Sequence, residues 1–289
     1  MLFNIRTRLT LATIAIIGVS GIATAFAQSS SAWQKELHAS ARLIAGAPVN
    51  SAEARWLRAG IEIRLDPGWK TYWRNPGDSG VPPTLDFAGS ANVKAVVALW
   101  PAPERFDDGS GGHSIGYVGD IVLPLRILPK DAAKPASLHV KLGYAICGRL
   151  CVPAEANLGL TVSDKTNAEE PALAMAERRV PRRVALGADA GASGSLGIRS
   201  VRRETSGTRG RVIVEVTAKD GIPVDLFVEG PTADWALPLP EPTANGAPGL
   251  RQFAFDLDGL STGAQTKGVK LTFTAVSPAD AIEVEAHLD

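Results

Sequence analysis

The feature that most constrains the fold of this chain is a series of short segments in which apolar and polar residues alternate. In the clearest segment, the apolar residues that share one face are Leu138, Val140, Leu142, Tyr144 and Ile146. A period of two is typical of a half-buried β-strand, because successive side chains point to opposite faces of a sheet. Residues 156–162 repeat the pattern directly afterwards. We therefore expect an all-β fold.

The composition favours many short strands over a few long elements. The chain has 29 glycines and 20 prolines among 289 residues, about 17%, whereas ordinary proteins average near 12%. Short alternating segments separated by such turn residues predict a β-sandwich over residues 28–165. Five further strand candidates predict a second, smaller sandwich over residues 198–289.

A different pattern separates the two predicted sandwiches, in residues 166–197. It begins with a helical stretch that has Pro171 near its first turn and acidic residues at its start, and Pro181 should end the helix. A glycine-rich run, 187–197, then has the composition of a flexible linker. The sequence thus predicts two domains joined by a short helix and a linker.

The first 27 residues have the organisation of a secretory signal peptide. Arg6 and Arg8 precede an apolar run, and Ala25 and Ala27 stand at the −3 and −1 positions of a cut before Gln28. The alternative is an uncleaved anchor, although Thr, Ser and Gly weaken the run compared with a spanning helix of about 20 apolar residues. Later segments are too short or too polar to span. We expect an exported protein without a membrane span after cleavage.

The charge of the chain does not indicate a nucleic-acid partner. Loss of Arg6 and Arg8 with the signal reduces the 30 basic residues to 28, against 30 acidic residues. A nearly neutral chain of this kind has no basic field for nucleic acid or for an anionic membrane surface.

Cys147 and Cys151 are the two cysteines of the chain, and they lie between two strand candidates in YAICGRLCVPAEA. Gly148 and Pro153 provide turn residues, so we expect a hairpin-like bend that brings the sulfurs together. A structural disulfide would contribute only about 2 kcal/mol, because it closes a short loop. The spacing favours a redox-active pair equally, since one thiol can resolve a mixed disulfide formed by the other.

Neighbouring residues bear on this choice. Arg149 would favour a thiolate if its guanidinium points towards a sulfur, and Tyr144 could shield the site from oxidants. A zinc site would need two more ligands in addition to the thiolates. The four histidines, none at ligand spacing from another, are His38, His113, His139 and His287. We therefore expect no metal and no cofactor.

Four segments, in this order along the chain, resemble one known family. They are GWKTYWRNPGDSGVPP, LWPAPERF, SIGYVGDIVLPLRI and YAICGRLCVPAEA. Together they make residues 40–162 similar to the N-terminal periplasmic domain of the thiol:disulfide interchange protein DsbD, and especially of the related suppressor-of-copper-sensitivity protein ScsB. The second half is more loosely similar to the additional β-domain of ScsB-type proteins.

The resemblance implies two immunoglobulin-like β-sandwich domains, with the cysteines at one end of the first. It also implies that the pair cycles between dithiol and disulfide, with Cys151 engaging partners and Cys147 resolving the mixed disulfide. The implied location is the periplasm of a Gram-negative cell. The implied partners are a membrane-embedded thiol reductant of the DsbD or CcdA kind and periplasmic thioredoxin-like proteins.

The chain departs from the family pattern in three respects. Three residues separate its cysteines, as in ScsB-like chains, whereas the enterobacterial DsbD domain has five. The aromatic cap loop of that domain corresponds here to the glycine-rich ERFDDGSGGHSIGY, in which Phe106 is the candidate cap. The transmembrane and thioredoxin-like domains of the full proteins are not found in this sequence, so we expect a separate membrane reductant.

The function predicted from the sequence is a protein-disulfide reductase that relays electrons from the membrane to periplasmic proteins, in the context of cytochrome c biogenesis or copper tolerance. Its catalytic residues would be Cys147 and Cys151. The candidate supporting or capping residues are Arg149, Tyr144, Phe106 and Pro153. The alternatives are a non-catalytic binding module with a structural disulfide and a copper-handling protein.

Overall fold

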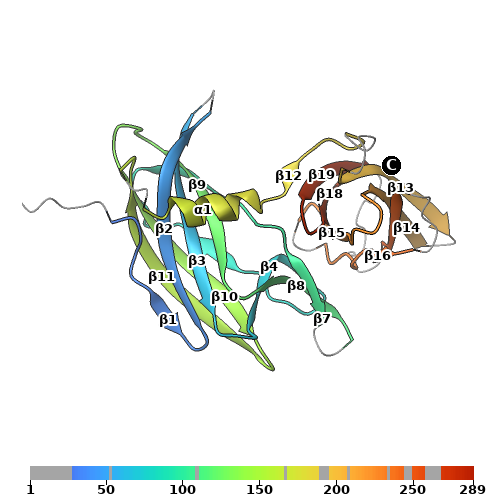
Figure 1. The fold of residues 1–289 in the computed structure, drawn as a ribbon, viewed down its shortest axis with the longest axis horizontal. Coiled ribbons are helices and arrows are strands. Elements are labelled where there is room, and N and C mark those ends of the chain that lie inside the picture. Colours follow the sequence, from blue (N-terminus) through green and yellow to red (C-terminus); the bar gives the residue numbers. More distant parts are fainter. Residues whose placement is uncertain are drawn as a thin grey trace, which may run out of the picture.

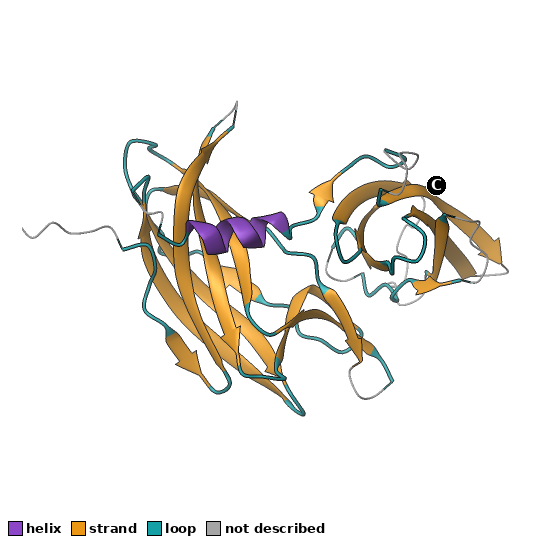
Figure 2. Ribbon diagram, in the orientation of Figure 1, coloured by secondary structure: helices purple, strands orange, loops and turns teal. Residues whose placement is uncertain are grey.

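The computed structural model describes residues 28–51, 54–107, 111–165, 168–188, 195–206, 209–232, 235–243, 249–257 and 268–289. Within these ranges nearly all regular structure is β, with a single short helix (Figures 1 and 2). The expectation of an all-β fold is confirmed. The predicted signal peptide, residues 1–27, lies outside the described residues. No helix in the described part of the chain is long and apolar enough to cross a membrane.

The first two sheets pack face to face and form what we call the N-terminal unit. The five-stranded sheet has the order β1 (Gln34–Glu36), β2 (Ala39–Asn50), β3 (Arg55–Leu65), β9 (Ile121–Pro129) and β6 (Val93–Ala98). The six-stranded sheet has the order β11 (Cys151–Val162), β10 (Ala136–Cys147), β4 (Lys70–Gly77), β8 (His113–Val118) and β7 (Glu104–Asp107), with β5 (Thr84–Asp86) paired to β10.

The alternation seen in the sequence determines which side chains enter the core between these sheets. All five apolar residues of the clearest segment, from Leu138 to Ile146, are buried in this core. On the opposite face of β10, Ala145 and Cys147 belong to a separate small buried cluster with Tyr72. The β10–β11 hairpin keeps an unbroken antiparallel register of 12 pairs that ends at Cys147 opposite Cys151.

The remaining strands form a second pair of sheets, the C-terminal unit, around a core of its own. One sheet has the order β12 (Arg182–Arg183), β19 (Ala281–Leu288), β18 (Val269–Val276) and β15 (Asp225–Glu229). The other has the order β13 (Gly197–Ser206), β14 (Arg209–Thr217), β17 (Leu250–Asp256) and β16 (Glu241–Pro242). All five strand candidates of this half are strands. Strand β13 was not among them, because its sequence GIRSVRRETS has no regular apolar alternation.

The predicted short helix is present as α1 (Glu170–Arg178), which packs against β2 and β9 (Figure 1). Its apolar contact is Leu173, which is fully buried. Glycines in the sheet allow this close approach: a Cβ atom at Gly60 would lie 3.1 Å from Leu173 Cδ1, and one at Gly46 would lie 2.9 Å from Leu173 Cδ2. The helix therefore packs on a part of the five-stranded sheet where larger side chains in place of the glycines would block its approach.

A charged cluster also attaches the helix to the sheet. The guanidinium of Arg58, on β3, is buried and donates to Glu170 at 2.7 Å and to Glu177 at 2.7 Å. Arg126, on β9, also pairs with Glu177. Burial alone would raise the pKa of Glu177, but the hydrogen bonds from Arg58 and Arg126 lower it below its ordinary value of 4.5.

Replacing Glu177 by Gln should lower the free energy of unfolding by about 2–3 kcal/mol at neutral pH, because Arg58 loses a charged partner inside a buried site. Since the folded state lowers the pKa of Glu177, its stabilising contribution is complete above pH 4.5 and disappears as the pH falls through the lowered value. Denaturant unfolding across this range should show the difference between native and Glu177→Gln protein shrinking in acid.

The matched control is Glu155→Gln, because the Glu155 side chain is 67% exposed and lies 3.9 Å from Lys141. This change should alter stability by less than about 0.5 kcal/mol. A Glu177→Gln difference that stays the same at every pH would contradict the assignment of the ionised carboxylate as the stabilising group.

Candidate functional site

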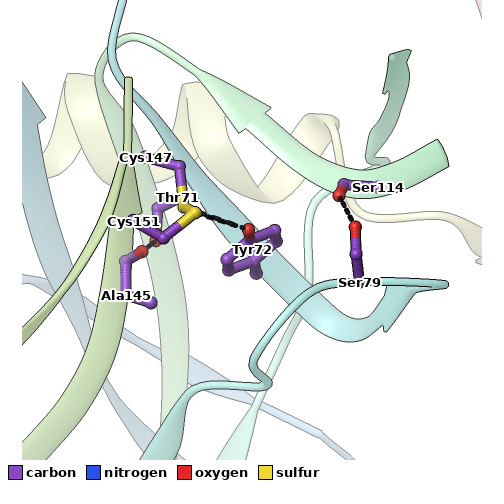
Figure 3. The surroundings of a disulfide bond; sticks show 7 residues. All are labelled: Thr71, Tyr72, Ser79, Ser114, Ala145, Cys147 and Cys151. Carbon is purple, nitrogen blue, oxygen red and sulfur yellow. Dashed lines mark hydrogen bonds between the residues drawn. A yellow bond between two sulfur atoms is a disulfide. The ribbon is translucent and has the colours of Figure 1, made fainter. Parts of the chain in front are cut away.

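The candidate site is the end of the β10–β11 hairpin, where Cys147 and Cys151 form a disulfide with a Cα–Cα distance of 4.1 Å (Figure 3). The expected hairpin-like bend is therefore present, and residues 148–150 connect the strands.

The hairpin register explains why a disulfide forms at this position. Asn157 directs both its N–H and its C=O away from β10, to the side chain of Gln34. Backbone direction alternates along a strand, so Cys151, six residues before Asn157, also directs its N–H and C=O away from β10. Cys151 and Cys147 therefore face each other as a non-hydrogen-bonded pair. Such pairs bring the two Cα atoms closest, to about 4.5 Å, and their side chains are adjacent. Pro153, four residues before Asn157, has the same backbone direction, so its missing N–H removes no ladder hydrogen bond.

The two cysteine residues differ in their exposure to solvent. Cys147 is 6% exposed and lies in the small buried cluster, whereas Cys151 is an exposed residue at the start of β11. A reagent or a protein can thus reach Cys151 first.

Tyr72 is the polar group in contact with the disulfide. Its hydroxyl oxygen lies 3.0 Å from the sulfur of Cys147 and 3.2 Å from that of Cys151 (Figure 3). Disulfide sulfurs carry no hydrogen, so the phenol donates. Strand β4 is held beside the hairpin because Thr71 Oγ1 donates to the carbonyl of Ala145 at 2.9 Å. Tyr72 was not among the site residues predicted from the sequence. It lies outside the main core that contains its neighbour Trp73, in the small cluster with Cys147.

Phe106, the candidate cap, lies beside this cluster. Its ring centroid is 6.5 Å from that of Tyr72, with the planes 27° apart, and the ammonium group of Lys70 lies 4.3 Å above it. It packs on the buried cluster that contains Cys147. Residues 108–110, in the region aligned with the family's cap loop, lie outside the described residues.

The other three candidate residues lie at different positions around the hairpin. Tyr144 is buried in the core on the face of β10 opposite Cys147, and the tyrosine in contact with the sulfurs is Tyr72. Burial and the charge of Glu36 raise the pKa of Tyr144 to about 12. Arg149 is exposed. Pro153, also exposed, lies opposite Ala145 in the hairpin.

Trp69 supports the connection between the two cysteines. A Cβ atom at Gly148 would lie 3.1 Å from its ring, so the chain passes directly over the indole. The indole also stacks on His38 with the centroids 4.0 Å apart, and His38 Nδ1 lies 2.9 Å from Asp66 Oδ2. The tip of the hairpin therefore rests on a stacked base.

A groove of about 300 Å³ opens beside the exposed sulfur. Its walls include Val81 and Pro82 on one side and Cys151 and Pro153 on the other. It has the size for one or two side chains of a partner segment. A larger cavity of about 670 Å³ lies between the two units, beside Arg105 and Asp225, and includes neither cysteine. In the described part of the chain, no three His, Cys, Asp or Glu side chains are grouped to hold a metal ion.

Comparison with known proteins shows which family the N-terminal unit is similar to. Residues 41–163 match the family described as thiol:disulfide interchange protein DsbD, N-terminal. The fold resembles the crystal structure of the N-terminal periplasmic domain of ScsB from Proteus mirabilis, with a TM-score of 0.67 and 22% sequence identity. That alignment covers 91% of this chain and 99% of the other. No curated protein sequence matches the chain.

Replacing Tyr72 by Phe should slow alkylation of the reduced site by iodoacetamide at pH 7 by about three- to tenfold, because the thiolate loses a hydrogen-bond donor. The rate-against-pH curve should move to higher pH. The measurement uses the rate at which the reduced protein gains carbamidomethyl groups, followed by mass spectrometry.

Tyr144→Phe is the matched control, because it removes a buried phenol oxygen that has no hydrogen-bond partner among the described residues. Its curve should coincide with that of the native protein. Equal effects of the two substitutions would show that Tyr72 acts only through general packing.

Proposed function

We propose that this chain is a periplasmic thiol:disulfide interchange protein that relays electrons through Cys147 and Cys151, because residues 41–163 match the DsbD N-terminal family. The electrons would come from a membrane-embedded thiol reductant and pass to thioredoxin-like proteins. We also propose that each unit is an immunoglobulin-like domain, at residues 28–165 and 198–289, joined by residues 166–197.

The observation that carries this proposal is the unequal exposure of two bonded cysteines: residue Cys151 is exposed and residue Cys147 is buried. Exchange needs one thiol that a partner can reach and a second thiol that no partner needs to reach. A disulfide whose only role was to stabilise the hairpin would add little, since the 12-pair register already closes this short loop.

The proposed reaction begins with the dithiol form. The Cys151 thiolate attacks a sulfur of the partner's disulfide, that bond breaks, and one partner sulfur leaves as a thiolate. A mixed disulfide now joins Cys151 to the partner. The Cys147 thiolate attacks Cys151 Sγ, re-forms the intramolecular disulfide and releases the second partner thiolate, so two electrons have moved to the partner. The membrane reductant then returns the site to the dithiol by the same exchange in reverse.

The neighbours of the disulfide fit this sequence of steps. The Tyr72 hydroxyl lies within hydrogen-bond distance of both sulfurs and can donate to whichever becomes a thiolate. Phe106, packed on the cluster around Cys147, would act as the cap that keeps other thiols and oxidants from the resolving sulfur.

The Cys147→Ser variant should form a stable mixed disulfide with a purified thioredoxin whose resolving cysteine is replaced and whose remaining cysteine is held as a disulfide with thionitrobenzoate. The Cys151 thiolate attacks the thioredoxin sulfur and releases thionitrobenzoate, and the adduct persists because neither protein has a resolving thiol. The adduct should be visible on a non-reducing gel and absent after dithiothreitol. Titration of the native protein in glutathione buffers should give a reduction potential above about −300 mV.

The matched controls are Cys151→Ser, which keeps only the buried thiol, and Cys147→Ser/Cys151→Ser. Both should give little or no adduct. A native potential well below that limit, together with no adduct from Cys147→Ser, would contradict the exchange function and favour the structural disulfide. Tight binding of Cu(I) by the dithiol form, lost in the double variant, would favour copper handling instead.

The capping role of Phe106 predicts that Phe106→Ala accelerates alkylation of Cys147 by about tenfold in a Cys151→Ser background, because the buried thiol becomes accessible. Phe106→Leu keeps most of the apolar cover and should have a smaller effect. If both variants react at the native rate, Phe106 does not cap the site.

A further inference from the structure

Strands β4 and β7 connect the disulfide with the C-terminal unit, because each strand contributes side chains to both. On β4, Tyr72 contacts the sulfurs while Trp73 and Arg74 contact the C-terminal unit. On β7, Phe106 stacks on Tyr72 while Arg105 contacts the C-terminal unit. Strands β4 and β7, which bring Tyr72 and Phe106 to the disulfide, are thus also in contact with the C-terminal unit.

The contacts of β4 with the C-terminal unit are close and directional. Arg74 donates from Nε to Glu229 at 2.9 Å and from Nη2 to Glu229 and Glu283 at 2.6 Å each. Trp73 is fully buried, and its ring centroid lies 5.9 Å from that of Phe227. The side-chain amide of Asn75 donates to the backbone carbonyl of Val228 at 2.9 Å.

The contacts of β7, which lies two positions from β4 in the sheet with β8 between them, repeat this arrangement. Arg105 pairs with Asp225 at 2.9 Å and with Glu241 at 2.7 Å, and it donates to the carbonyl of Pro240 at 2.9 Å. Asp225 and Glu229 are the two ends of β15, so that strand receives both arginines.

These contacts matter because β4 is poorly held within its own sheet. It pairs with β10 only through Lys70 and Thr71, and its register with β8 shifts between Tyr72 and Gly77. Beyond Tyr72, the next four residues have no ladder partner among the described strands. Their position therefore depends on side-chain contacts, which are made with the C-terminal unit and, for Trp73, also with the core of the N-terminal unit.

The charged side chains between β4 and the C-terminal unit form an ion pair of defined orientation. The side chains of Arg74, Glu229 and Glu283 are 25%, 20% and 8% exposed, and the guanidinium binds Glu229 through two nitrogens. Burial alone would lower the pKa of Arg74, but the carboxylates of Glu229 and Glu283 raise it. A two-pronged pair of this kind specifies orientation as well as distance, which a lysine does not.

We propose that Arg74 and Arg105 are positioning residues for thiol–disulfide exchange: the C-terminal unit holds β4 and β7, and through them holds Tyr72 and Phe106 against the cysteines. This inference gives the C-terminal unit a role in the reactivity of a site it does not touch. It rests on the proposed function only in that the positioned groups serve exchange.

The test is a double-mutant cycle in the full chain, with Cys147→Ser as the background so that Cys151 is the single thiol. Arg74→Met should slow alkylation of Cys151 by iodoacetamide at pH 7 by about threefold or more, and should move the rate-against-pH curve upwards, because Tyr72 no longer reaches the thiolate. In a Tyr72→Phe background, Arg74→Met should have no further effect.

Two further variants keep the test decisive. Glu229→Gln weakens the same contact from the C-terminal unit with a nearly isosteric change, and it should move the curve as Arg74→Met does. Arg202→Met removes an arginine that pairs with Glu204 and Glu215 inside the C-terminal unit, and it should leave the curve unchanged. Thermal unfolding would confirm that each variant is folded.

A folded Arg74→Met or Glu229→Gln protein with the native curve would overturn the inference. So would a shift that persists undiminished when Tyr72 is already Phe, since the arginine would then act by another route. The outcome is separate from that of the proposed function, because alkylation uses a small reagent, whereas failure of exchange would be seen as the absence of an adduct with thioredoxin.

Discussion

The site depends on the register of one hairpin. Because β10 and β11 pair without a break, Cys147 and Cys151 meet in a non-hydrogen-bonded position. A slip of one residue would turn each side chain of the slipped strand to the other face of the sheet, and the sulfurs would no longer meet. The same register places five apolar side chains in the core and leaves Ala145 and Cys147 facing Tyr72. Core packing and the geometry of the sulfurs are therefore set by a single choice of pairing.

The features of this arrangement that could be predicted are those whose residues are contiguous in the sequence. The alternation in β10 and β11, the turn residues between them and the two cysteines are contiguous, so the hairpin and its sulfur pair were predicted. Strand β2 was not, because its sequence ASARLIAGAPVN is built largely from small residues on both faces, as its packing against α1 requires. Strand β13 was not predicted either, because its charged sequence has no regular apolar alternation.

The part that could not be predicted depends on contacts distant in the sequence. Tyr144 was selected because it is near Cys147 in the chain, but the pleat turns it into the core. Tyr72 is 75 residues from Cys147 and is brought to it by the pairing of β4 with β10. Arg74 and Glu229 are 155 residues apart. No periodicity indicates such partners, since each is decided by how whole sheets pack.

Pro153 has a further consequence for the behaviour of the protein in a crowded compartment. Strand β11 is the last strand of its sheet, and the outward phase that exposes Cys151 also exposes backbone groups of that edge. An open edge beside a reactive sulfur invites another copy to add a strand and to form an unwanted bridge between chains. Proline offers no donor there, and the side chain of Gln34 already occupies the backbone groups of Asn157. The edge therefore lacks the continuous row of free backbone donors and acceptors that strand addition requires, while Cys151 stays exposed.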